Sequence, residues 1–181
     1  MKFNKYYFRE CLCEYLCNEI VSNIPSHLFR IFFYKKVAGI KVGKESSIAM
    51  HVKFRSPWKI IIEDNCAINQ DCYLDGRGGL IIGKNVNISR GTSIHTATHN
   101  YNSKDFRYVE KGVVLEKDVW VASNCIILPG ITLEKGSVVG AGSVVTKTVE
   151  KYTVVAGNPA RERKKRNSKL NYKTNYFRLL S

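Results

Sequence analysis

LEKDVWVASNCIILPGITLEKGSVVGAGSVVTKTV, residues 115–149, repeats one pattern every six positions. The first position of each unit is aliphatic: Leu115, Val121, Ile127, Leu133, Val139 and Val145. A second series of small or β-branched side chains follows four residues behind: Val119, Cys125, Ile131, Ser137, Ser143 and Val149. Ordinary strands alternate every two residues and helices repeat every 3.6, so neither explains this period. The pattern is typical of a parallel β-helix, in which each unit forms one short strand and one corner.

The same period continues, with interruptions, towards the N-terminus. Inward positions are expected at Val42, Ile48 and Phe54, at Ile62, Ile68 and Leu74, and at Ile82, Ile88 and Ile94. The step is eight residues from Phe54 to Ile62 and from Leu74 to Ile82, which predicts two extra residues at a corner. The step of twenty-one from Ile94 to Leu115 predicts a longer excursion. Three strands per coil would give roughly five coils, each buried by its neighbours.

Length and composition favour a single domain with flanking extensions. Among the 181 residues no apolar run is long enough to span a membrane, and polar residues interrupt any signal-peptide core. Cys66, Cys72 and Cys125 fall on inward positions, where a thiol fills space, and the other cysteines lack CxxC spacing. We therefore expect a cytoplasmic protein without a disulfide framework or a metal site.

Residues 1–39 follow a different pattern, which predicts an amphipathic helical extension. Apolar residues recur at helical spacing as far as Pro25, and a second apolar segment ends beside Lys35 and Lys36. The open end of a β-helix must be covered against strand addition, so an end cap is expected. Basic and aromatic side chains also suit peripheral contact with the anionic inner face of the cytoplasmic membrane, and the two roles can coexist.

Four segments carry a resemblance to a known family. They are His95-Thr96-Ala97-Thr98-His99-Asn100, Asp118-Val119-Trp120-Val121-Ala122-Ser123, Val139-Gly140-Ala141-Gly142-Ser143-Val144-Val145-Thr146-Lys147 and Ala156-Gly157-Asn158-Pro159-Ala160-Arg161. In this order they resemble the hexapeptide-repeat acyltransferases, above all the galactoside, maltose and surface-polysaccharide O-acetyltransferases. The resemblance implies a left-handed parallel β-helix over residues 40–160, an exception to the right-handed crossover rule. It also implies a homotrimer that binds acetyl-CoA between subunits.

Acetyl transfer to an alcohol needs a base for the hydroxyl proton and a donor for the oxyanion. Histidine suits the first task near neutral pH. Two of the four histidines, His95 and His99, stand at the start of the long excursion. The resemblance assigns the base to His99, because the family base lies in an Ala-Thr-His-like segment before an extended loop. His95 directly follows the inward Ile94 and is the alternative base; the remaining alternative is that neither histidine is catalytic.

Ser123 and Ala141 are eighteen residues apart, which is three units of the repeat. In uninterrupted coils they stack at the strand spacing of about 4.8 Å, and their backbone groups line one groove. A pantetheine arm could extend along it. The spacing therefore predicts that Ser123 and Ala141 bind the cofactor, and the resemblance makes the Ser123 amide the oxyanion donor. The alternative is that both are only corner residues.

The resemblance also assigns residues to the acceptor and to the nucleotide. Trp120 precedes the inward Val121, so it should point outward, either as a trimer contact or as an aromatic wall beside the sugar. Asn69 matches an acceptor-contacting position. Three positions match the nucleotide end of the cofactor, where cations meet phosphate oxygens: Thr146, Lys147 and Arg161.

The net charge of +14 exceeds what one cofactor requires, and basic residues gather in a C-terminal tail, residues 161–181. These side chains are either simply solvated or attract anionic lipid or an acidic saccharide. No nucleic-acid-binding motif accompanies them, so nucleic acid is not an expected partner.

The sequence therefore predicts a trimeric acetyl-CoA-dependent O-acetyltransferase that modifies a saccharide or lipid-linked saccharide in capsule, exopolysaccharide or O-antigen synthesis. The alternatives are an amino-sugar N-acetyltransferase, an antibiotic O-acetyltransferase and a non-catalytic β-helix binding or assembly module. A zinc-dependent β-helix hydratase is disfavoured, because only His95 and His99 are candidate ligands close together.

Overall fold

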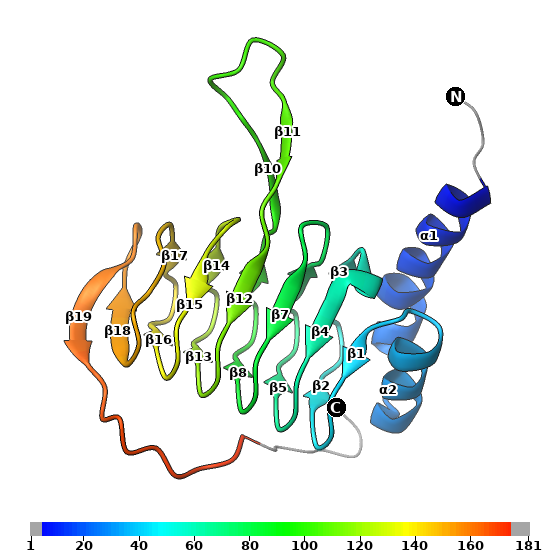
Figure 1. Ribbon diagram of the computed structural model, residues 1–181. Coiled ribbons are helices and arrows are strands. Elements are labelled where there is room, and N and C mark those ends of the chain that lie inside the picture. Colours follow the sequence, from blue (N-terminus) through cyan, green and yellow to red (C-terminus); the bar gives the residue numbers. More distant parts are fainter. Residues whose placement is uncertain (1–4, 175–181) are drawn as a thin grey trace.

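A computed structural model of the chain describes residues 5–174 (Figure 1). Residues 1–4 of the expected N-terminal extension and residues 175–181 of the expected basic tail lie outside the described residues. The predicted parallel β-helix is confirmed: five complete coils of three strands each are followed by the start of a sixth. Among the described residues, no helix is long and apolar enough to cross a membrane.

Three sheets form the faces of the β-helix. Sheet 1 contains β1 (Lys41–Val42), β4 (Ile60–Ile62), β7 (Leu80–Ile82), β12 (Val113–Leu115) and β15 (Thr132–Leu133). Sheet 2 contains β2 (Ser47–Ile48), β5 (Ala67–Ile68), β8 (Asn87–Ile88), β13 (Trp120–Val121), β16 (Val138–Val139) and β18 (Thr153–Ala156), with β19 (Arg161–Lys165) at its edge. Sheet 3 contains β3 (Lys53–Arg55), β6 (Tyr73–Asp75), β9 (Ser93–Ile94), β14 (Ile126–Ile127) and β17 (Val144–Val145). Apart from β19, neighbouring strands of the three sheets are parallel.

Both series predicted to point inward are buried. Every member between Leu115 and Val149 is at most 6% exposed, so each coil adds one more apolar layer to a continuous core. The inward cysteines belong to these layers. Burial raises the pKa of the Cys66 and Cys72 thiols to about 11, so they stay protonated and fill space.

The corners of the β-helix are of two kinds. The first corner (sheet 1 to sheet 2) and the second corner (sheet 2 to sheet 3) turn through left-handed residues, mostly Asn, Asp or Gly, which tolerate positive φ. At the second corner these are His51, Asp71, Gly91, Asn124 and Gly142. The third corner (sheet 3 to sheet 1) contains all three predicted interruptions. They are a 3-10 turn, η3 (Pro57–Lys59), the turn 76–79, and the long excursion.

The excursion between Ile94 and Leu115 is an antiparallel hairpin of β10 (Ala97–His99) and β11 (Tyr108–Glu110). It projects from the β-helix well beyond the other turns (Figure 1).

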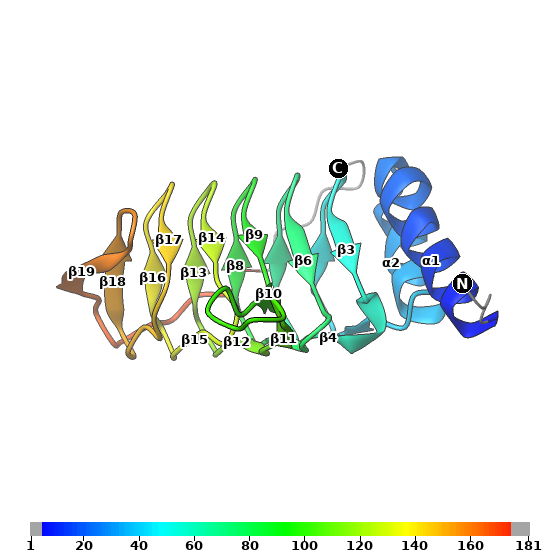
Figure 2. The ribbon, with the colours of Figure 1, turned by 90° about the horizontal axis from the view of Figure 1, so that it is seen from above.

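The N-terminal helices cover the open end of the first coil (Figure 2). They are α1 (Lys5–Tyr15), η1 (Leu16–Ile20), η2 (Val21–Asn23) and α2 (His27–Lys36). Asn18 pairs with both backbone groups of Phe54, through Nδ2 to the carbonyl and Oδ1 to the amide, at 2.8 Å each. The fully buried Arg30 donates to the Ile48 carbonyl at 3.1 Å. These contacts occupy edge groups of the first coil that would otherwise accept another strand.

The C-terminal segment covers the other end and then turns back. β19 pairs antiparallel with β18, so the strand Arg161–Lys165 belongs to sheet 2. The following residues lie along the first corner, where Arg166 donates to the Asp118 carbonyl at 3.0 Å and Asn85 donates to the Tyr172 carbonyl at 2.9 Å. The described part of the basic tail, residues 161–174, therefore lies against the β-helix.

Candidate active site

An open groove of about 830 Å³ lies over sheet 2 beside the second corner. Trp120, Ser123 and Ala141 line one side of it, so the structure brings these three predicted site residues together. The opposite wall is basic and comes from the C-terminal segment, namely from Lys164, Lys165 and Arg166.

Ser123 and Ala141 occupy equivalent positions in adjacent coils, as their spacing predicted. Val121 pairs with Val139, and the Gly142 amide donates to the Ser123 carbonyl at 2.9 Å. In the part of the chain that the structure describes, the amides of Ser123 and Ala141 donate to no protein acceptor. Two unpaired donors one strand spacing apart are suited to bind carbonyl oxygens of an extended ligand, or a developing oxyanion.

Trp120 points outward and is 45% exposed. Its Nε1 donates to the Ser89 hydroxyl, one coil earlier, at 3.2 Å, which fixes the indole beside the groove. Asn69 lies one coil before Ser89 at the same corner position, and its Nδ2 donates to the Ile88 carbonyl at 2.9 Å. The sequence did not single out Ser89, because an outward serine in this repeat has no distinguishing signal.

His99 lies on the projecting hairpin, exposed to solvent. Its Nδ1 is 2.8 Å from the Phe106 carbonyl, and its ring stacks on Phe106 with centroids 4.3 Å apart. A carbonyl can only accept a hydrogen bond, so Nδ1 carries the proton and Nε2 keeps a free lone pair. This tautomer is the one that a general base requires.

His95 has a different environment from His99. It remains in the coil, where its amide donates to the Ile127 carbonyl at 3.0 Å. Its half-buried ring packs against Tyr73 with centroids 5.4 Å apart.

His99 and Ser123 belong to different corners of the β-helix. The hairpin rises from the third corner, whereas Ser123 lies at the second, and the two corners form separate edges of the molecule (Figure 2). One chain alone therefore does not place the candidate base over the candidate oxyanion donor.

The predicted nucleotide-binding residues lie near the C-terminal end of the β-helix. Lys147 and Arg161 line a small hollow of about 290 Å³ that also contains Glu150 and Glu162. Thr146 is exposed close by. The structure thus separates these residues from the basic wall of the main groove. The sequence did not predict this separation, because Arg161–Lys165 lacks the apolar alternation that would identify it as a strand.

Within residues 5–174 there is no group of three or more His, Cys, Asp or Glu side chains that could hold a metal ion.

A parallel β-helix with a groove lined by amides defines a hexapeptide-type transferase. Residues 112–147 match the family described as bacterial transferase hexapeptide (six repeats). The chain is 34% identical over 128 residues to an Escherichia coli protein named "Putative colanic acid biosynthesis acetyltransferase WcaF", covering 71% of this chain and 70% of that protein. The chain therefore belongs to the hexapeptide-repeat acyltransferases, and the predicted enzyme class, an acetyltransferase, is confirmed.

Two solved structures share nearly the whole fold. The maltose O-acetyltransferase of Clostridium difficile 630 is 27% identical, with a TM-score of 0.80 over 91% of this chain and 90% of that one. A hexapeptide-repeat acetyltransferase of Vibrio cholerae, complexed with acetyl-CoA, is 26% identical, with a TM-score of 0.78 over 89% of this chain and 87% of that one.

Proposed function

We propose that this protein is an O-acetyltransferase that transfers acetyl from acetyl-CoA to a sugar hydroxyl during synthesis of a surface polysaccharide. The observation that carries the proposal is His99, whose Nδ1 is held by the Phe106 carbonyl so that Nε2 is free to accept a proton. Similarity to a colanic acid biosynthesis acetyltransferase and to a maltose O-acetyltransferase supports the choice of a saccharide acceptor.

The reaction uses few groups of the chain. His99 Nε2 removes the acceptor hydroxyl proton as the oxygen attacks the thioester carbonyl. The Ser123 amide donates to the oxyanion, and the Ala141 amide binds the pantetheine arm along the groove. Collapse of the intermediate breaks the carbon–sulfur bond, and the leaving thiolate takes the proton from the imidazolium. Trp120 and Asn69 contact the acceptor, while Thr146, Lys147 and Arg161 bind the nucleotide.

The positions of His99 and Ser123 favour a homotrimer with sites between subunits. The two residues lie at different corners of one chain. A site that contains both therefore requires the hairpin of one subunit to meet the groove of its neighbour. Three such contacts close a ring.

Mixed trimers test this arrangement. At acetyl-CoA concentrations near the wild-type KM, trimers of His99→Ala alone or of Ala141→Phe alone are expected to have little activity. The first lacks the proposed base, and the second binds acetyl-CoA weakly because its groove is obstructed. Trimers containing both chains regain activity only if His99 of one subunit serves the groove of another. Mixed trimers without activity, or an active monomer by light scattering, contradict the shared site.

The acceptor is identified by measuring thiol release from acetyl-CoA with free, nucleotide-linked and lipid-linked sugars. An O-acetyl ester is expected, and it is hydrolysed by mild alkali. A product that survives alkali indicates an amino-sugar N-acetyltransferase. Absence of turnover with every acceptor indicates a non-catalytic module.

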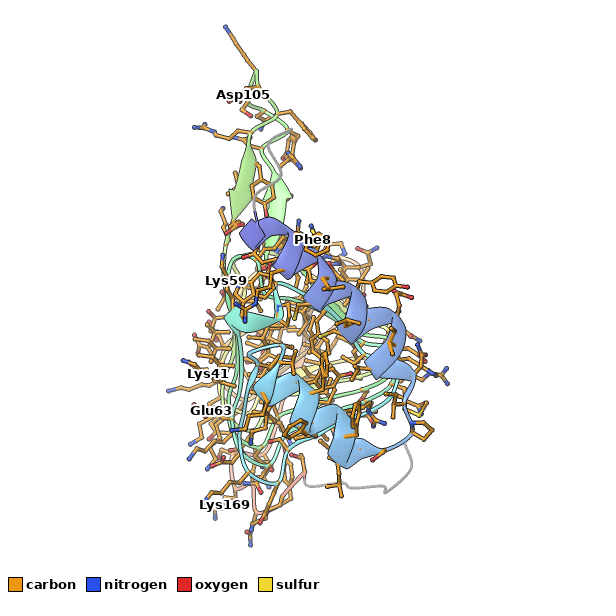
Figure 3. All side chains as sticks on the ribbon, turned by 90° about the vertical axis from the view of Figure 1, so that its right-hand side faces the viewer. Phe8, Lys41, Lys59, Glu63, Asp105 and Lys169 are labelled. Atoms are coloured by element: carbon orange, nitrogen blue, oxygen red, sulfur yellow. The ribbon has the colours of Figure 1, made fainter. Side chains whose placement is uncertain are left out.

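A lipid-linked acceptor would place the protein at an anionic membrane, and the N-terminal cap, residues 5–39, is suited to this contact. The cap helices face the viewer in Figure 3. Leu28 and Phe32 are 67% and 60% exposed, on the helix that ends with Lys35 and Lys36. Wild-type protein should float with vesicles containing phosphatidylglycerol but not with neutral vesicles, and Leu28→Glu should abolish flotation. No flotation of the wild type would exclude membrane contact.

A further inference from the structure

A glycine-rich turn, Asp75-Gly76-Arg77-Gly78-Gly79, lies at the third corner. It begins the coil that ends in the hairpin, and the proposed reaction does not use it. Its Asp75 carboxylate is fully buried. Both carboxylate oxygens accept from the Arg77 guanidinium, Oδ1 from Nε at 3.0 Å and Oδ2 from NH2 at 2.9 Å. Oδ1 also accepts from the Arg77 amide at 3.0 Å. A two-point ion pair with this geometry fixes the plane of the guanidinium.

The same carboxylate holds the base of the hairpin. Oδ2 accepts from the Thr96 amide at 2.9 Å, and the Thr96 hydroxyl donates to the Asp75 carbonyl at 3.1 Å. Thr96 in turn accepts from the Lys111 amide at 2.8 Å, so both stems of the hairpin are tied to this turn. Gly78 permits the close approach, since a Cβ there would lie 2.5 Å from the Thr96 carbonyl oxygen.

The other side of Arg77 contacts the hairpin near its candidate base. The guanidinium lies over the Tyr108 ring, 5.9 Å from its centroid. Tyr108 is the register partner of His99, and their rings meet edge to face with centroids 5.6 Å apart. A two-stranded hairpin with three residues per strand has little stability of its own, so these contacts decide where His99 points.

We propose that Arg77 is a positioning residue for His99: locked by the buried Asp75, it holds the Tyr108 ring against which the imidazole packs. The inference rests on the proposed role of His99 as the base. A displacement of about 1 Å in a reacting group can cost roughly 10²-fold in rate, so the orientation of the imidazole matters as much as its presence.

Arg77→Lys tests the inference, because lysine keeps the charge but loses the planar two-point pair and the stacking. Turnover should fall about 10–10²-fold, while the KM for acetyl-CoA and the melting temperature stay close to wild type. Arg55→Lys is the matched control. Arg55 pairs with Asp75 in strand register and forms an ion pair with Glu14 at 3.0 Å in the cap, away from the hairpin, so turnover should be unchanged.

Tyr108→Leu provides a second variant in case Arg77→Lys folds poorly. It leaves the Asp75–Arg77 pair intact and removes only the ring between Arg77 and His99. It should lower turnover by a similar factor at unchanged acetyl-CoA affinity. Wild-type turnover of Tyr108→Leu would overturn the inference.

A double-mutant cycle separates positioning from general structural damage. If Arg77 acts through His99, Arg77→Lys should change the residual rate of His99→Ala by less than about twofold. A full further loss in that background would show that Arg77 acts elsewhere. A fully active His99→Ala enzyme would overturn the base assignment itself. If His99→Ala is inactive but Arg77→Lys is fully active, only the positioning role of Arg77 is overturned.

Discussion

The second and third corners of the same β-helix present opposite solutions to building a site. At the second corner every coil turns in the same tight way, and the proposed functional groups are the backbone amides of Ser123 and Ala141. At the third corner the turns differ from coil to coil, and the proposed functional group is one side chain, His99, on a projecting hairpin. The regular corner offers a repeated ladder of donors for an extended ligand. The irregular corner offers a single side chain, His99, whose orientation must be fixed by its contacts.

The two corners are therefore held by different forces. The position of Ser123 follows from strand register and the apolar layers, and no special side chain is needed. The position of His99 depends on individual polar contacts, from the Phe106 carbonyl to the buried Asp75 carboxylate. Substitutions at the irregular corner should consequently affect rate, whereas those at the regular corner should affect cofactor binding.

The largest effect is expected for His99→Ala, which removes the proposed base. Acetyl transfer should fall about 10²–10⁴-fold, the usual span for a positioned general base. Because His99 is exposed on the hairpin, acetyl-CoA affinity by calorimetry and the melting temperature should remain near wild type. A large loss of acetyl-CoA affinity would instead show that the hairpin binds the cofactor.

The sequence predicted the regular corner well and the irregular corner poorly. A six-residue period determines which side chains are inward and which corner positions stack, so the neighbourhood of Ser123, Ala141 and Trp120 followed from counting. At the third corner the broken period revealed only how many residues were extra. Nothing in the spacing indicated that Asp75 would be buried beneath the hairpin, because a charged residue in a glycine-rich turn is normally solvated.

The C-terminal segment was unpredictable for a related physical reason. Arg161–Lys165 has the composition of a solvated tail, yet it pairs with β18 as an edge strand. Basic residues are common on edge strands because they prevent further strand addition, so composition alone does not separate the two states. The placement of Lys164 on the groove wall required the fold.

Next in size is the effect of Ala141→Phe at the regular corner. The exposed Ala141 side chain faces the groove and not the core, so the protein should stay folded while the ring fills the path of the pantetheine arm. Overpacking of about 1–3 kcal/mol corresponds to roughly a 5–150-fold loss of acetyl-CoA affinity. Ala141→Gly is the control and should bind normally. If Ala141→Phe binds acetyl-CoA as well as the control, the cofactor lies elsewhere.

Asp75→Asn should produce a smaller, pH-dependent loss of stability at the irregular corner. Burial raises the pKa of the Asp75 carboxyl, but the Arg77 guanidinium and the amides of Thr96 and Arg77 outweigh burial, so the pKa lies below its ordinary value. A carboxyl with a lowered pKa stabilises the fold above its unfolded pKa of about 3.9, and this stabilisation is lost as pH falls through the folded value.

At pH 7 the Asp75→Asn variant should therefore unfold more easily by about 1–3 kcal/mol, the cost of a lost charged hydrogen-bond partner. The difference in melting temperature from wild type should be constant down to about pH 5 and shrink below about pH 4. Calorimetric scans from pH 3 to pH 7 measure it. A difference that grows on acidification would contradict the sign of the shift.

The smallest effect is expected for His95→Ala. His95 stands four residues before His99, but its ring packs on Tyr73 within the regular coil and not on the hairpin. Loss of one aromatic contact should cost about 0.5–1.5 kcal/mol of stability, with turnover near wild type. Tyr73→Leu removes the other ring of the same contact, so its melting temperature should match that of His95→Ala. If His95→Ala abolished turnover while His99→Ala remained active, the base would belong to the regular coil. In that case the base would lie in the coil beside the third corner and not on the projecting hairpin.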